Sequence, residues 1–187
     1  MGKTFSEISE ELKDWISEQK MFVVATAPLG DDGFINCSPK GLDAFRILHP
    51  LQVAYLDLVG SGIETVAHLR ENGRIVLMFS AFTGAPQIVR LHGHGEAIFP
   101  DDDRFEALAE KFPKLPGIRS IILIDVTRVS RSCGYGVPLY DYQGDRKTLV
   151  QWAEKKSTKE LADYQASKNR TSIDGLPGIS IHEQDNK

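Results

Sequence analysis

Apolar residues along the first 130 positions fall in short blocks that alternate with polar residues or run without interruption, and this pattern predicts strands. Turn-forming Gly, Pro, Asn or Asp residues lie between most of the blocks. The blocks cover residues 21–27, 34–38, 51–57, 74–79, 87–99 and 118–129. Strands outnumber helical crossovers, so a mainly β (α+β) fold built on a small six-stranded antiparallel barrel fits better than a doubly wound parallel sheet.

Helical spacing of apolar residues appears in a few segments around these strands. Residues 6–20 form an amphipathic pattern behind a capping box in which Thr4 is the N-cap and Glu7 the third helical residue. Two further short helices are predicted, over 63–71 with a left-handed stop at Asn72-Gly73, and over 104–112.

The end of the chain has a different pattern. Residues 149–153 and 161–164 predict two helices, and 172–178 is irregular but apolar enough to dock. We therefore expect a single domain over residues 1–187, with a barrel at about 20–131 and a C-terminal helical extension at about 132–187.

Charge and cysteine content narrow the possible partners. The 187 residues carry 22 basic and 26 acidic side chains without a basic run, which argues against nucleic acid or an anionic membrane surface as a partner. No apolar run approaches the ~20 residues that span a bilayer. Cys37 and Cys133 do not make a disulfide framework and are expected to be free thiols, with Cys37 buried. No secretory segment is recognised, so we expect a cytoplasmic protein.

Candidate chemistry is clearest where the strand ending at Asp57 leads through Gly60-Ser61-Gly62 into a helix. Free backbone N–H groups and the positive end of the helix dipole would meet at this loop, which is the arrangement of an anion site. The hydroxyls of Ser61 and Thr65 add two donors. The alternative is a glycine turn followed by an ordinary cap, and the pattern alone leaves both interpretations open.

A second candidate is Lys40, which follows Pro39 at a break in a strand and precedes Gly41. A lysine beside such a break can point into a cleft and bind phosphate, although a solvated turn lysine is the more common case. In the next-to-last strand, Arg90, His92 and His94 share one face by period two. No further ligand type completes a metal site there, and we expect none. Arg90 could bind an anion or form an ion pair. The glycine-rich segment 130–138, with Tyr135, predicts either a surface turn or a wall for a planar ligand.

The order of these segments resembles the flavin-binding split-barrel superfamily, and within it the branch related to pyridoxamine 5′-phosphate oxidase. The similar stretches are 36–43, 55–57 with 60–74, and 87–96. This resemblance implies a split barrel that forms a homodimer, with two FMN molecules in clefts at the subunit interface. By position, Thr65 falls where the oxidase has a phosphate-binding lysine and Glu64 falls where it has an arginine.

The resemblance also assigns the candidate cofactor-binding residues, which line the flavin or approach its phosphate. They are Ser38, Pro39, Lys40, Gly41, Tyr55, Asp57, Gly60, Ser61, Thr65 and Arg90. The oxidase's C-terminal substrate-binding residues have no match in 132–187, so oxidation of pyridoxamine phosphate is not expected.

The function implied is that of an FMN-dependent oxidoreductase acting on a small molecule, with no residue assigned as acid or base. Two alternatives stay open. One is a flavin-binding or stress-associated module without enzymatic activity. The other is a relative that binds deazaflavin or haem in the same cleft, for which His92 and His94 are the only ligands the sequence offers.

Overall fold

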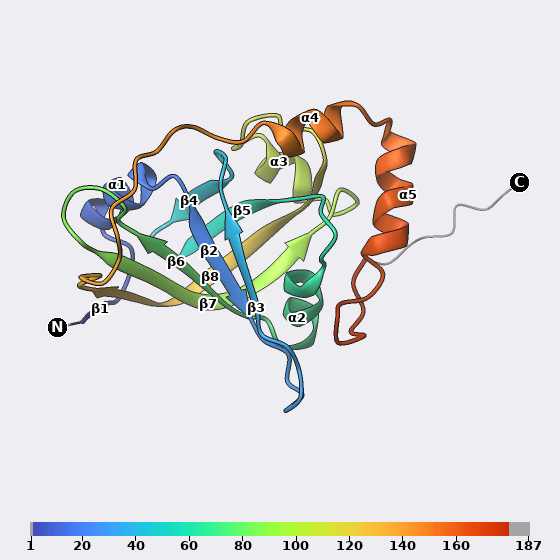
Figure 1. Cartoon of the computed structure of the whole chain (residues 1–187). Coiled ribbons are helices and arrows are strands. Elements are labelled where there is room, and N and C mark those ends of the chain that lie inside the picture. Colours follow the sequence, from blue (N-terminus) through green and yellow to red (C-terminus); the bar gives the residue numbers. More distant parts are fainter. Residues whose placement is uncertain (1, 180–187) are drawn as a thin grey trace, which may run out of the picture.

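A computed structural model describes residues 2–179 and contains one eight-stranded antiparallel sheet (Figure 1). The strands are β1 (Lys3–Phe5), β2 (Phe22–Thr26), β3 (Asn36–Lys40), β4 (Phe45–His49), β5 (Gln52–Leu58), β6 (Arg74–Ser80), β7 (Ile88–Ile98) and β8 (Ile118–Ser132). Their order across the sheet is β3-β2-β6-β7-β8-β5-β4, and β1 pairs with β8. The prediction of an antiparallel, β-rich fold is therefore confirmed.

The predicted number of strands was wrong. Eight strands are present rather than six, because β1 and β4 were not recognised, and no pairing between β3 and β4 closes the sheet within residues 2–179. The sheet nevertheless curls strongly. Phe22 of β2 and Phe45 of β4 lie near opposite edges, yet their ring centroids are 5.4 Å apart and both rings contact Phe79. The aromatic cluster thus fills the interior of a split barrel.

Strand β5 and the first half of β8 are covered on both faces. On β5, Val53 and Tyr55 point into the main core, whereas Ala54 and Leu56 point into a second cluster with Phe105. On β8, consecutive isoleucines divide between the same two cores. A strand covered on both faces needs apolar residues at consecutive positions, which explains the apolar run 121–124 at the centre of the block predicted at 118–129.

The helices α1 (Glu10–Glu18), α2 (Glu64–Asn72) and α3 (Phe105–Ala109) pack around the sheet. The capping box was wrong: Thr4 belongs to β1, and Ser9 is the N-cap of α1, with its side chain accepting a hydrogen bond from the Leu12 N–H. Pairing of residues 3–5 with β8 outweighs the local helix signal. The predicted stop of α2 is confirmed, because Gly73 has φ of 70°.

The chain beyond β8 forms an extension, which the structure describes over residues 133–179, and it crosses the barrel and ends beside α2 (Figure 1). It contains α4 (Thr148–Glu154) and α5 (Thr158–Lys168), which confirms both predicted helices. The tail that follows α5 folds back on itself through a bridge between Thr171 and Pro177. No helix among residues 2–179 has the length and apolar character needed to cross a membrane.

Candidate functional site

A cavity of about 1080 Å³, the main cavity, lies between the sheet and the extension. Its sheet-side wall comes from the end of α1, from β3 and the turn after it, and from the end of β5. Its other wall comes from residues 140–146 and from the start of α4. The lining is mostly apolar, with Leu56 and Leu58 on one side and Trp152 on the other, as expected for a site that binds an organic molecule.

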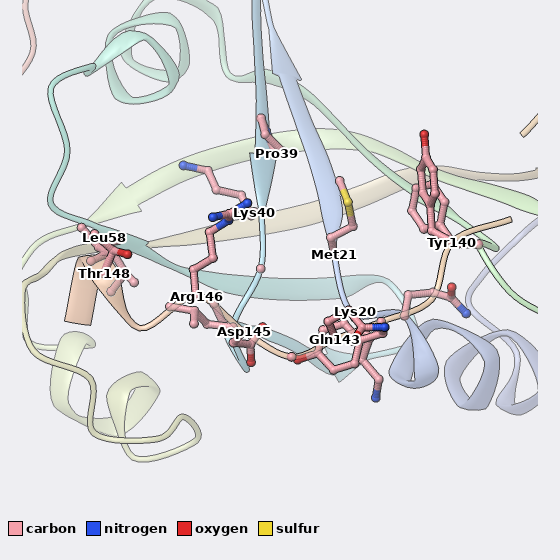
Figure 2. Close-up of a pocket in the computed structure, with 18 of the residues that line it drawn as sticks. Lys20, Met21, Pro39, Lys40, Leu58, Tyr140, Gln143, Asp145, Arg146 and Thr148 are labelled. Carbon is pink, nitrogen blue, oxygen red and sulfur yellow. The ribbon is translucent and has the colours of Figure 1, made fainter. Parts of the chain in front are cut away.

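The segment 139–147, called the strap, is held to the sheet by two aromatic contacts. The ring of Tyr140 stacks on Phe82 at 5.4 Å between centroids, and its N–H donates to the Phe82 carbonyl at 2.9 Å. Tyr142 lies under the ammonium of Lys20, 5.9 Å from ring centroid to nitrogen. Figure 2 shows Arg146 extending from the strap toward Lys40. The strap therefore adds a cation to a cavity whose lining already contains Lys20 and Lys40.

A buried charge cluster lies behind Lys40. The Asp57 carboxylate accepts a hydrogen bond from Nε of Arg119 at 2.8 Å and from the hydroxyl of Ser120 at 3.2 Å. The ammonium of Lys40 lies 3.7 Å from the other carboxylate oxygen. Asp57 is 1% exposed and Arg119 is 5% exposed, so this is an internal ion pair that fixes Lys40 at the cavity wall.

Residues 60–62, called the Gly60–Gly62 loop, are held in place through their backbone carbonyl groups. The amide of Asn169 donates to the carbonyl oxygens of Gly60, at 3.0 Å, and of Ser61, at 3.5 Å. Arg119 donates through Nη1 to the Gly62 carbonyl at 2.8 Å. Helix α2 begins directly after, and its N-cap, Ile63, has no side chain that could satisfy the free N–H groups.

Thr65 and Ser38 belong to a hydrogen-bonded network beside the loop rather than to the cavity lining. The amide of Asn36 donates to the hydroxyl oxygens of Thr65, at 2.9 Å, and of Thr26, at 3.1 Å, while Ser38 donates to the Asn36 oxygen at 2.9 Å. The network continues from Thr26 to Nδ1 of the buried His68 at 2.9 Å. It joins β3 to α2 and so fixes the start of the helix.

Tyr55 is fully buried in the main core. Burial, and to a lesser extent the nearby Asp57 carboxylate, raises the pKa of this phenol well above its usual range. Tyr55 therefore stays neutral at physiological pH, and its ring, 6.0 Å from the Lys40 ammonium, supports that cation from beneath.

Arg90 and the histidines of β7 lie apart from the main cavity. Arg90 donates to the hydroxyl of Ser132 at 3.1 Å, and His92 lines a separate hollow of about 390 Å³. Within residues 2–179 no cluster of three or more ligand-type side chains could hold a metal ion. Cys37 and Cys133 are free, as predicted, but the burial predicted for Cys37 was wrong: it is exposed because β3 turns Ser38, not Cys37, inward.

The sequence-predicted residues thus divide into those in the cavity wall and those behind it. Pro39, Lys40, Gly41 and Gly60 line the main cavity. Ser61 is exposed next to Gly60, whereas Ser38, Tyr55, Asp57 and Thr65 lie behind the wall and Arg90 lies elsewhere. The residues that sequence reasoning missed are Arg119, Arg146 and Asn169. A charged residue inside the apolar 118–129 block was a usable signal for Arg119, but the other two gave none.

The split sheet, with a cleft bounded by a glycine loop at a helix start, defines a split-barrel class of protein. The sequence model of pyridoxamine 5′-phosphate oxidase matches residues 8–133, and the chain belongs to that family. It is 40% identical over 192 residues to the pyridoxamine 5′-phosphate oxidase family protein ustO of Aspergillus flavus, covering 94% of this chain and 77% of ustO. The resemblance stated from the sequence is thereby confirmed.

Solved structures show the same fold. A variant of HupZ from Group A Streptococcus superposes with a TM-score of 0.54 at 23% identity, covering 67% of this chain and 99% of that one. A putative pyridoxamine 5′-phosphate oxidase from Lactobacillus delbrueckii superposes with a TM-score of 0.50 at 19% identity, covering 67% of this chain and 94% of that one. In each case about a third of this chain lies outside the matched part.

Proposed function

We propose that this protein binds FMN in the main cavity and acts as an oxidoreductase on a small molecule. The observation that carries the proposal is the Gly60–Gly62 loop, whose carbonyls are tied to the protein interior beside Lys40 at the rim of a large apolar cavity. Family membership supports a flavin as the bound group. The haem alternative is not favoured, because His92 and His94, the haem ligands that the sequence offers, do not line the main cavity.

The residues present fit a flavin phosphate at one end and its ring system further in. The loop and the start of α2 would hold the phosphate through backbone N–H groups and the Ser61 hydroxyl, and Lys40 would supply a cation. Pro39 to Gly41 would flank the ring, with the neighbouring Ser38 oriented by Asn36. When bound, the flavin supplies the redox chemistry, while the protein binds, orients and excludes water.

One feature opposes anion binding and makes the proposal testable in both directions. The Glu64 carboxylate lies where a side chain on Gly62 would stand, and it accepts a hydrogen bond from the Ile173 N–H at 3.3 Å. Ser61→Asp adds a second carboxylate at the phosphate position and should weaken FMN at least about tenfold. Glu64→Gln removes the existing one and should tighten FMN about fivefold, from ~1 kcal/mol of relieved repulsion.

Fluorescence titration with FMN and with riboflavin measures both effects. Riboflavin lacks the phosphate, so its affinity should change little in either variant. Equal losses of both ligands in Ser61→Asp, or no loss of either, would show that the loop is only a turn with a cap. An absorbance spectrum of the purified protein separates flavin from deazaflavin and haem, and turnover with candidate reductants separates an enzyme from a binding module.

We also propose that the protein is a homodimer with the cofactor at the interface. The outer edge of β3 pairs with no other strand within residues 2–179, and Leu29, Phe34 and Ile35 at the tip of the β2–β3 hairpin are 61–76% exposed. Edges and apolar tips of this kind are usually covered in soluble proteins. Light scattering at micromolar concentration should give twice the mass of 20.8 kDa, and a monomer would contradict the interfacial cleft.

A further inference from the structure

The tail after α5 contacts the candidate phosphate loop directly, although it lies outside the 8–133 family match. Asn169 is 0% exposed, and its amide nitrogen points at two consecutive loop carbonyls. The other polar atom of this side chain, Oδ1, is buried without a hydrogen-bond partner among residues 2–179. An unpaired buried oxygen is costly, so an asparagine here is explained by what its nitrogen does at the loop.

The direction of the loop N–H groups follows from the way its carbonyls are held. In a planar trans peptide, the carbonyl of one residue and the N–H of the next point in opposite directions. The loop peptides are trans, and the Gly60 and Ser61 carbonyls face Asn169 while the Gly62 carbonyl faces Arg119. The N–H groups of Ser61, Gly62 and Ile63 must therefore point away from these two side chains.

The tail makes further contacts that keep Asn169 in place. The N–H of Ile179 donates to the Asn169 carbonyl at 2.9 Å, and Arg70 of α2 donates to the carbonyl of Gly178. Gly178 itself packs so closely that an added Cβ would lie 2.2 Å from the Asn169 carbonyl oxygen. Asp174 accepts a hydrogen bond from the Phe34 N–H at 3.1 Å and so ties the tail to the β2–β3 hairpin.

From this geometry we propose that Asn169 and Arg119 are positioning residues that turn three consecutive backbone N–H groups of the Gly60–Gly62 loop toward a bound phosphate monoester. The inference rests on the proposed function, because it assigns the donors of the same phosphate site. It also makes the C-terminal tail a part of that site. Neither side chain contacts the ligand, since each acts through the loop carbonyls.

Two substitutions test the proposal independently. Asn169→Ala removes the donor to the first two carbonyls, and Arg119→Lys keeps a cation for Asp57 while losing the fork that reaches Gly62. Each should weaken FMN about three- to tenfold and riboflavin less than about twofold. Ser167→Ala, an exposed neighbour on α5, is the matched control and should change neither ligand.

Ser61→Asp, measured in the same titrations, separates failure of this inference from failure of the proposed function. If Ser61→Asp discriminates against FMN but Asn169→Ala and Arg119→Lys do not, the positioning role is wrong and the phosphate site stands. If wild type binds FMN no better than riboflavin, both are wrong. If circular dichroism shows that Asn169→Ala does not fold, Arg119→Lys decides alone.

A second measurement uses amide NMR. Adding inorganic phosphate should shift the amide resonances of Ser61, Gly62 and Ile63 in wild type, and these shifts should be smaller in the folded variants. Shifts as large in those variants as in wild type would contradict the proposal.

Discussion

The barrel and the extension are held together by different interactions. The barrel buries nearly all of the apolar core, including both faces of β5 and β8. In the extension, by contrast, the buried residues up to 179 are Gly134, Ala153, Asn169, Ser172 and Gly178, and only Ala153 among them has an apolar side chain. The barrel therefore supplies the stability, whereas the extension shapes the main cavity and contacts its loop through hydrogen bonds. A side chain can matter greatly for stability in the first region and for ligand binding in the second.

The largest expected effect tests the barrel side of this comparison. Arg119→Met removes the partner of the buried Asp57 carboxylate and should lower the free energy of unfolding by about 3–5 kcal/mol. Urea denaturation measures it. Arg131→Met is the matched control, because its partner Glu11 is exposed, and it should cost less than ~1 kcal/mol. Equal losses in the two variants would show that the internal pair contributes no more than a surface pair.

A moderate effect tests how the extension is attached. Ala153 of α4 is 2% exposed and packs against Gly117, where an added Cβ would lie 3.1 Å from the Ala153 Cβ. Ala153→Leu should overpack this contact at a cost of about 1–3 kcal/mol. Limited proteolysis should then cut the strap faster than in wild type, with the barrel fragment surviving. Loss of the barrel at the same rate would mean that the two regions unfold as one unit.

The smallest expected effect is a pH dependence of the free energy of unfolding, which arises from His92 on the outer face of the barrel. Burial, together with the charges of Arg128 and Arg90, lowers the pKa of His92 from its usual 6.5. The unfolded chain then binds the proton more readily, so this contribution to stability is complete above pH 6.5 and is lost as pH falls below it. The drop in urea midpoint between pH 7.5 and 5.5 should be smaller in His92→Gln. An identical drop would show that the His92 environment does not differ between the folded and unfolded chains.

The sequence predicted the parts of the fold that depend on local pattern. The apolar blocks became strands, and the Asn72-Gly73 stop and both extension helices are confirmed. Local pattern failed where pairing between distant segments decides the structure. Residues 3–5 carry a helix-start motif but pair with β8. Pro39, which was expected to interrupt its strand, lies within β3, because β3 is an edge strand that pairs with β2 alone.

The candidate site was predictable to the same extent. Lys40 and the Gly60–Gly62 loop were found from residue type and turn chemistry, because both signals lie within a few residues. Asn169 was not, since its hydrogen-bond acceptor at Gly60 is 109 residues away and nothing near Asn169 marks it. Tyr55 and Asp57 were singled out as site residues, and their burial could not be read from a strand in which both faces are covered.

The same separation of 109 residues has a consequence for biosynthesis. Proteins emerge from the ribosome N-terminus first, at ~5–20 residues per second, so roughly 5–20 s pass between synthesis of the Gly60–Gly62 loop and synthesis of Asn169. During that interval the barrel strands can already pair, while the loop lacks the side chain that holds its carbonyls. A nascent or C-terminally truncated chain would thus present a folded barrel with an unbraced loop, and assembly of the site is postponed until the last part of the chain has docked.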